Sequence, residues 1–334
     1  MPRQTKQNKI CTPELLEQVS PENKQLIKDF LSYLQSIQRS QTTIEAYEHD
    51  LQIWSCWNVQ FNQNKLFVDL TKRNIVAYQD WLLNVNENSP ARVRRLKSAL
   101  SSMADYVELI LDDEYPTFRN TINKIASPPN QPVREKTVFE KEDLDKLLSI
   151  LVERKQYQKA CCVALAMSSG ARKSELTRFK VSYFDENNII NGMMYKTPEK
   201  IKTKGRGHQG KQLTKYTLVE SFKPYFDLWM KQREELGVDS EWLLVSKSDD
   251  GKWEQIKPET LNSWANTFTK LIGIDFYFHS LRHYLVGKLE SELNIPANLI
   301  KTWNGWASVA LVDVYRDRDE TDELIEAFNS NEEE

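Results

Sequence analysis

The chain has 334 residues, 40% hydrophobic and 28% charged, which is typical of a soluble globular protein with room for two domains. It holds no apolar run of the roughly 18–20 residues that a membrane span needs, and its N-terminus lacks the apolar stretch of a secretory signal. We therefore expect a cytoplasmic protein. The cysteines have neither disulfide-framework nor metal-site spacing, and they are Cys11, Cys56, Cys161 and Cys162.

The formal net charge of −3 is unevenly distributed along the chain. Residues 313–334 hold ten acidic and two basic side chains, a net −8, so the remaining 43 basic and 38 acidic side chains give residues 1–312 a net +5. A net charge of −3 argues against a polyphosphate partner such as nucleic acid. The net positive charge of residues 1–312 nevertheless permits a nucleic-acid-binding face.

The first half of the chain has the pattern of a helical domain. Residues 1–20 lack clear periodicity and predict a flexible arm. From residue 21 to about 110, apolar residues recur at a spacing near 3.6 and predict four helices. Ser40 and Thr71 are typical starts of the second and third helices, and Ser89-Pro90 of the fourth. We expect a compact all-α domain over residues 21–126.

The run Ser127-Pro128-Pro129-Asn130-Gln131-Pro132 is rich in helix breakers and predicts a linker over residues 127–136. A second domain over 137–315 would begin with helices at about 140–154 and 159–168. The β-prone stretch at 189–218 predicts a small antiparallel sheet or ribbon, and helices resume afterwards, notably at 258–271, 279–293, 296–303 and 307–314. The predicted fold class is mainly α with a small antiparallel β-sheet, followed by an acidic tail at 316–334.

Side chains suited to phosphodiester chemistry are spread over this second half. Arg172 follows the turn Ser168-Ser169-Gly170-Ala171, His279 and Arg282 are three residues apart, and Trp306 precedes Tyr315 by nine residues. An arginine fork gives two parallel hydrogen bonds to a phosphate and keeps its charge. A helix would place His279 and Arg282 on one face. Taken singly, these residues have ordinary explanations as a helix start, a surface pair and a core tryptophan.

In combination, the motifs resemble tyrosine recombinases of the phage-integrase, Xer and Cre kind. The resemblance covers nearly the whole chain, since Thr42-Thr43-Ile44-x-x-Tyr47-x-x-Asp50-Leu51 also resembles the family's second N-terminal helix. It implies a two-domain, C-shaped clamp around duplex DNA, in which the helical N-terminal domain binds the core site and the second domain is catalytic.

The resemblance also assigns roles to these residues. Arg172 and Arg282 would hold one phosphate, and His279 would donate a hydrogen bond or relay a proton. Trp306 occupies a position where most members carry His and Cre-like members carry Trp, which can donate but cannot titrate. Tyr315 would be the nucleophile that forms a 3′-phosphotyrosine.

A general acid for the 5′-oxygen is expected from a lysine of the ribbon. Lys204 lies just before the predicted turn at residues 205–210, and Lys202 is the alternative on the same face of the strand. Glu175 would support the site by orienting its neighbours. The fourth helix offers candidate DNA contacts, with a solvated helix face as the alternative explanation, and these are Arg92, Arg94, Arg95 and Lys97.

The resemblance implies a site-specific DNA recombinase, encoded by a bacterium, a phage or a mobile element. It would act as a homotetramer on double-stranded DNA, pass through a Holliday junction, and possess no cofactor, metal or ATP site. The segment 321–328 would dock on a neighbouring protomer through Leu324, Ile325 and Phe328, and an accessory DNA-bending or directionality factor is a further expected partner. The alternatives are a type IB topoisomerase, a catalytically silent DNA-binding regulator and a helical protein-interaction module.

Overall fold

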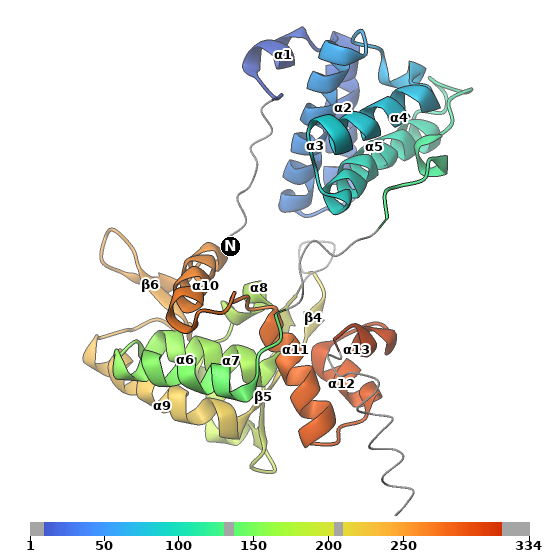
Figure 1. Ribbon diagram of the computed structural model, residues 1–334. Coiled ribbons are helices and arrows are strands. Elements are labelled where there is room, and N and C mark those ends of the chain that lie inside the picture. The colour runs from blue at the N-terminus through green and yellow to red at the C-terminus, as the bar shows by residue number, and fades with distance from the viewer. Residues whose placement is uncertain (1–9, 130–136, 204–209, 316–334) are drawn as a thin grey trace, which may run out of the picture. The chain divides into compact units, whose positions relative to one another are not determined.

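The structure is a computed structural model that describes residues 10–129, 137–203 and 210–315, with the backbone alone at 313–315. These residues divide between two compact units, an N-terminal unit of residues 10–129 and a C-terminal unit of residues 137–315 (Figure 1). Among the helices so described, none combines the length and the apolar character needed to cross a membrane.

The N-terminal unit consists of helices throughout its described residues. Its α-helices are α1 (Pro13–Gln18), α2 (Pro21–Ser36), α3 (Gln41–Phe61), α4 (Lys72–Asp80) and α5 (Pro90–Ile110). The shorter helices are η1 (Phe67–Asp69), η3 (Ile122–Lys124) and the π-helical turn η2 (Trp81–Val85), which continues α4. The predicted helix starts are confirmed, because the side chains of Ser40, Thr71 and Ser89 each accept a backbone N–H in the first turn.

The expectation of a loose N-terminal arm is wrong for residues 10–20. The Thr12 hydroxyl caps α1, Pro13 fills its first position, and the helix packs against α3. Ile10 and Cys11 lie against the core of the unit. A six-residue helix is too short to show a periodic apolar stripe. Its start is indicated instead by the capping residues Thr12 and Pro13.

An ion-paired carboxylate joins the two longest helices of this unit. Asp50 on α3 is 1% exposed, and it lies 2.8 Å from Arg92 Nη2 and 3.3 Å from Arg95 Nε on α5. Around this contact the core is apolar, with Leu51, Trp54 and Leu100 fully buried. Asp50 therefore fixes the register of α3 against α5, because a buried carboxylate must be paired.

The C-terminal unit is mainly helical. Its α-helices are α6 (Lys141–Glu153), α7 (Tyr157–Ser169), α8 (Lys173–Leu176), α9 (Val219–Glu235), α10 (Pro258–Ile272), α11 (Ser280–Gly287), α12 (Ala297–Asn304) and α13 (Ala310–Tyr315). Shorter turns are η4 (Val181–Phe184), η5 (Glu186–Asn188) and the π-helical turn η6 (Lys288–Glu292), which continues α11.

The strands of this unit form three small antiparallel pieces. They are β1 (Ile189–Ile190), β2 (Met194–Lys196), β3 (Ile201–Lys202), β4 (Gln212–Leu213), β5 (Tyr216–Leu218), β6 (Val245–Lys247) and β7 (Trp253–Gln255). The first sheet has the order β1-β2-β5, and the other two are the hairpins β3-β4 and β6-β7. The prediction of strands between residues 189 and 218 is confirmed.

The hairpin β6-β7 was not predicted, since only helices were expected after residue 218. Its strands follow the buried pair Leu243 and Leu244, and Lys247 pairs with Trp253 across the hairpin, with the ammonium 5.7 Å from the ring. The turn contains Gly251 at φ +85°. A three-residue strand of mixed polarity shows too little alternation of apolar and polar residues to be distinguished from a loop by its sequence.

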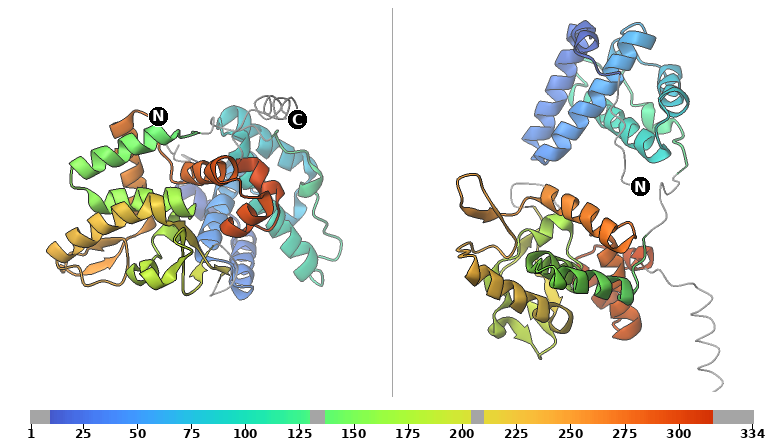
Figure 2. Two further views of the ribbon diagram at one scale, coloured as in Figure 1. Left: turned by 90° about the horizontal axis from the view of Figure 1, so that it is seen from below. Right: turned by 60° about the vertical axis from the view of Figure 1, so that its left-hand side comes forward.

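Helix α7 lies at the centre of the C-terminal unit. It packs against α6, α9 and α11 (Figure 1), and most of its side chains are buried. Helices α12 and α13 (red) lie beside α11 (Figure 2). There Leu285, Ile300, Trp306 and Val312 form a separate apolar cluster. The C-terminal end of α7 thus lies where the segments carrying Arg172, Arg282 and Trp306 come together.

Candidate active site

A tight turn at the end of α7 places Arg172. Gly170 ends the helix in the left-handed conformation, at φ +59° and ψ 20°, and Arg172 is the N-cap of α8. A Cβ at position 170 would lie 3.0 Å from Leu285 of α11 and 3.1 Å from Asn304 of α12. The glycine therefore permits both the turn and the close approach of two other helices.

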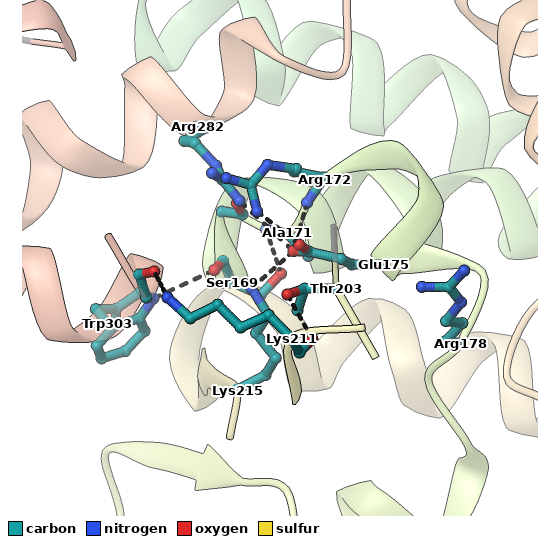
Figure 3. A network of polar contacts seen from close by, with 12 residues as sticks. Ser169, Ala171, Arg172, Glu175, Arg178, Thr203, Lys211, Lys215, Arg282 and Trp303 are labelled. Atoms are coloured by element: carbon teal, nitrogen blue, oxygen red, sulfur yellow. Dashed lines mark hydrogen bonds and ion pairs between the residues drawn. The ribbon is translucent and has the colours of Figure 1, made fainter. Parts of the chain in front are cut away.

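The carboxylate of Glu175 is the centre of a buried ion cluster (Figure 3). Its Oε1 lies 2.8 Å from Arg172 Nη1, and its Oε2 accepts the backbone N–H of Arg172 at 2.9 Å. Oε2 also lies 2.7 Å from Lys215 Nζ and 3.6 Å from Arg282 Nη2. Burial alone would raise the pKa of Glu175, but Lys215, the Arg172 N–H and Arg282 outweigh it and hold the pKa below its usual value.

Arg282 comes from α11, far along the chain, and is 1% exposed. Its Nε donates to the carbonyl oxygen of Gly170 at 2.6 Å. This bond joins α11 to the α7–α8 turn, so the guanidinium groups of Arg172 and Arg282 meet at Glu175. In the view of Figure 3 both arginines approach the carboxylate from above. The structure thus brings together Arg172 and Arg282, the two predicted phosphate ligands, which are 110 residues apart in the sequence.

His279 is the N-cap of α11, one turn before Arg282. The residue is exposed, and its ring meets that of His283 at 5.7 Å between centroids and 86° between planes. Desolvation of the ring lowers the pKa of His279 to about 4, together with the positive charges of Arg282, His283 and Arg172. The imidazole is therefore neutral at neutral pH, with one nitrogen able to donate and the other to accept.

Trp306 follows α12 and is 7% exposed, within the apolar cluster of α11, α12 and α13. The turn before it depends on Gly305, at φ +66°, whose carbonyl oxygen accepts a hydrogen bond from Lys211 Nζ at 2.8 Å. A Cβ on Gly305 would lie 2.1 Å from Leu213 of β4. The hairpin β3-β4 is therefore held against the segment that carries Trp306.

Of the two candidate general acids, only Lys202 belongs to the described residues. It is an exposed residue of β3, and its side chain lies alongside Gly210, while the carbonyl of Lys202 accepts from Arg178. Lys204 lies outside the described residues. The backbone of Tyr315 ends α13, a helix that contacts α11 and α12. The structure thus places the segment of Tyr315, but not its phenol.

Three residues of this region were missing from the predicted site, namely Lys211, Lys215 and Trp303. Lys215 is 1% exposed and pairs with Glu175, and Trp303 donates from Nε1 to the carbonyl of Ser169 at 3.2 Å. A signal for Lys215 was present, because strand alternation puts residues 213, 215 and 217 on one face, and Thr217 is buried with it.

The structure shows that the basic residues predicted to contact DNA differ in their exposure. Arg94 and Arg95 are exposed, and Arg92 is partly exposed. Lys97 is 6% exposed, and its ammonium donates to the carbonyl of Ile125 and to Ser127 Oγ at 3.2 Å. Its burial argues against a phosphate contact by Lys97, which instead ties the segment after η3 to α5.

No group of three or more His, Cys, Asp or Glu side chains with metal-binding geometry occurs among the residues that the structure describes. The four cysteines are unbridged, and burial raises the pKa of Cys161 and Cys162 above that of an ordinary thiol. These thiols are core residues of α7, as expected.

The chain resembles known recombinases in sequence and in fold. It is 27% identical over 260 residues to the SPbeta prophage-derived recombinase-like protein YomM of Bacillus subtilis (strain 168), a match that covers 77% of this chain and 74% of the relative. Two solved structures share the fold at low sequence identity. The Tn1549 transposon integrase in complex with a circular intermediate DNA has 12% identity and a TM-score of 0.66, with 91% of this chain and 99% of that chain covered.

The lambda integrase tetramer bound to a Holliday junction has 16% identity and a TM-score of 0.63, with 92% and 82% covered. The model of the phage integrase family matches residues 137–322, which is the C-terminal unit together with the start of the tail. This match spans the turn of Arg172, the helix of Arg282, the segment of Trp306 and the helix of Tyr315. The protein is a member of the phage integrase family, with the fold of the tyrosine recombinases.

Proposed function

We propose that this protein is a site-specific DNA recombinase that cleaves and rejoins strands through a 3′-phosphotyrosine. The observation that carries the proposal is the meeting of Arg172 and Arg282 at one buried carboxylate, Glu175. Three cations around one anion leave the cluster with a net charge of +2, which suits a phosphodiester. A purely structural ion pair would need only one cation.

In the proposed reaction Arg172 and Arg282 bind the nonbridging oxygens of one phosphodiester, with Trp306 as a further donor. The Tyr315 oxygen attacks phosphorus as the phenol passes its proton to neutral His279 or to water, so the Tyr Oη–P bond forms and the P–O5′ bond breaks. Lys204, or Lys202 in its place, gives a proton to the leaving 5′-oxygen, and neutral His279 donates to the phosphate or relays a proton. Attack by the 5′-hydroxyl of another strand reverses these steps.

Each cleavage conserves one phosphoester bond, so rejoining needs no nucleotide triphosphate. The arginines supply the positive charge that the transition state requires, so the proposal includes no metal or other cofactor. Strand cleavage should therefore persist in the presence of a chelator.

The proposed partner is a specific site on double-stranded DNA, bound by both units. The N-terminal unit would serve as the core-binding domain, with the exposed Arg94 and Arg95 as DNA contacts, and residues 137–315 as the catalytic domain. The similar lambda integrase was captured as a tetramer on a Holliday junction, and we propose the same assembly and intermediate here. An accessory bending or directionality factor would select the direction of exchange.

The assembly would be held by the C-terminal segment, which lies outside the described residues. We propose that Leu324, Ile325 and Phe328 of the segment 321–328 dock on a neighbouring protomer. Deletion after Arg318 should then prevent tetramer formation on DNA while leaving binding of single protomers intact. Unchanged assembly and recombination in the truncated protein would rule this docking out.

Trapping of the covalent intermediate tests the proposed chemistry. A binding site would first be selected from random duplexes with the full-length protein, and then nicked near the scissile position so that the cleaved strand diffuses away. Denaturing gels should show a protein–DNA adduct, and mass spectrometry should place the nucleotide on Tyr315. Tyr315→Phe should bind the duplex and form no adduct.

The same preparations separate the rival activities. Strand exchange between two marked duplexes is expected of a recombinase, whereas relaxation of supercoiled DNA without exchange would indicate a topoisomerase of type IB. Wild-type protein that binds its site and never forms an adduct would indicate a regulator built on this fold.

A further inference from the structure

Lys215 has an unusual position for a lysine. It is 1% exposed, directly before β5, and its ammonium lies 2.7 Å from Glu175 Oε2. Lysine is rarely buried without a partner, because desolvation of an ammonium is costly. The ion pair of Lys215 is with Glu175, so we expect its effect on chemistry to pass through Glu175.

We infer that Lys215 is a positioning residue that occupies Glu175 Oε2 and thereby prevents this carboxylate from drawing Arg282 into a close ion pair. The inference rests on the proposed function, since it concerns the same phosphate site. It assigns Lys215 no contact with DNA and no proton transfer.

The distances around Glu175 support this assignment. The Arg172 side chain lies 2.8 Å from Glu175 Oε1, and the Arg172 backbone N–H donates to Glu175 Oε2 at 2.9 Å. Lys215 takes Oε2 at 2.7 Å, whereas Arg282 Nη2 stays at 3.6 Å, beyond hydrogen-bonding distance. Arg282 is instead anchored by its Nε on Gly170 O at 2.6 Å. The carboxylate is thus satisfied chiefly by Arg172 and Lys215.

The sheet fixes the backbone of Lys215 at this place. Its N–H donates to Thr197 Oγ1 at 3.0 Å, and its carbonyl accepts the N–H of Thr197, also at 3.0 Å. The neighbouring residues continue the pairing, with Lys196 opposite Tyr216. Burial lowers the pKa of the Lys215 ammonium, and Glu175 offsets part of this effect. The side chain therefore enters the cluster from a backbone position that is hydrogen-bonded to Thr197, from below in the view of Figure 3.

Loss of the Lys215 charge would remove the 2.7 Å cation from Oε2 and leave the Arg172 N–H as a close donor to this buried oxygen. The guanidinium of Arg282 is the next cation, and its Nη2 would need to approach by less than about 1 Å to form a hydrogen bond at ordinary distance. A phosphate would then compete with Glu175 for Arg282. Removal of both charges, at Lys215 and at Glu175, abolishes that competition.

A double-mutant cycle tests the inference. We expect Lys215→Met to slow covalent adduct formation on the nicked duplex by about tenfold or more, the order of coupling energies between contacting charged groups. The double variant Lys215→Met/Glu175→Gln should react faster than Lys215→Met. If Lys215 were needed only for folding, the double variant would form the adduct no faster than Lys215→Met.

Binding of inorganic phosphate gives a second measurement that requires no reaction. The Nε–H resonance of Arg282 in ¹⁵N-arginine protein would be followed as phosphate is added. Affinity should fall in Lys215→Met and recover in the double variant. If the phosphate affinities of the three proteins follow this order but the wild-type protein never forms an adduct, the proposed function is contradicted. The inference about Lys215 would still stand.

Controls separate folding from positioning. Lys223→Met removes a lysine that pairs with Asp227 on the surface of the same unit, and it should change neither adduct formation nor phosphate affinity. If Lys215→Met does not fold, Glu175→Gln becomes the reference, and adding Lys215→Met to it should alter the adduct rate by less than about threefold. Equal phosphate affinity in Lys215→Met and wild type, or a larger loss in the Glu175→Gln background, would overturn the inference.

Discussion

Glu175 stays ionised although it is fully buried, because its contacts with Arg172 and Lys215 replace the water that it has lost. The same contacts set the places of the cations that would bind phosphate. Sequence reasoning identified Glu175 as a supporting residue and left out Lys215, which lies 2.7 Å from its Oε2. The charged groups of the site therefore depend on one another.

His279 provides a prediction on pH. Its pKa lies near 4 in the folded protein, below the ordinary 6.5, so the unfolded chain binds more protons between these values. The contribution of His279 to stability is complete above pH 6.5 and is lost as the pH falls towards 4. Urea unfolding of wild type and His279→Gln should show the difference between them shrinking over this window, and ring NMR should report the pKa directly.

Bound phosphate should raise the pKa of His279, since an anion beside the ring favours the imidazolium. NMR titration of the ring with and without inorganic phosphate measures this shift. An unchanged pKa would mean that phosphate binds away from His279 and would remove the residue from the proposed site. His49 on α3, in the other unit, is the internal control.

Among the elements, the hairpin β3-β4 is joined to the end of α12 at Gly305. Gly305→Ala should lower the free energy of unfolding by about 1–2 kcal/mol from the left-handed backbone alone, at φ +66°. A further loss should follow from the displaced Leu213, whose Cδ1 would lie 2.1 Å from the new Cβ. Urea unfolding measures both effects together.

Gly273→Ala is the matched control, because Gly273 also ends a helix with positive φ and a Cβ there would meet nothing within 4 Å. The excess loss in Gly305→Ala therefore reports the contact with Leu213. Equal losses in the two variants would show that the hairpin is not held at Gly305.

The contact of α3 with α5 depends on Asp50. Asp50→Asn should lower the free energy of unfolding of the N-terminal unit by about 2–4 kcal/mol, since it breaks a buried ion pair whose arginines keep some water. Asp227→Asn removes an exposed pair with Lys223 and should cost less than about 1 kcal/mol. Similar losses at the two sites would contradict a specific role for Asp50.

At the scale of the whole chain, the acidic total conceals a mildly basic body, because residues 313–334 carry a net −8 and residues 1–312 a net +5. DNA binding by the N-terminal unit should follow exposed charge rather than total charge. Arg94→Ala should weaken binding and reduce the slope of log K against log salt by about one. Lys97→Met should leave the slope unchanged, because Lys97 is 6% exposed and its ammonium donates to the carbonyl of Ile125, whereas Arg94 is exposed. Fluorescence anisotropy over a salt series measures both.

Periodicity and caps predicted most of the helices, and the motifs around Arg172, Arg282 and Trp306 predicted the family. The same reasoning failed for α1 and for β6-β7, because elements of three to six residues show too little periodicity. It also placed Lys97 with Arg94 and Arg95, although 3.6 residues per turn puts position 97 on the face of Val93 and Leu100, which are buried.

The sequence by itself determined the fold class, the family and the identity of the residues that bear charge. Only the tertiary structure decided which of these charges meet, because Glu175 in α8, Lys215 just before β5 and Arg282 in α11 are distant along the chain. Burial removes water from all three, so their pairing and their pKa values depend on contacts that local patterns do not encode. The role inferred for Lys215 follows from that contact alone.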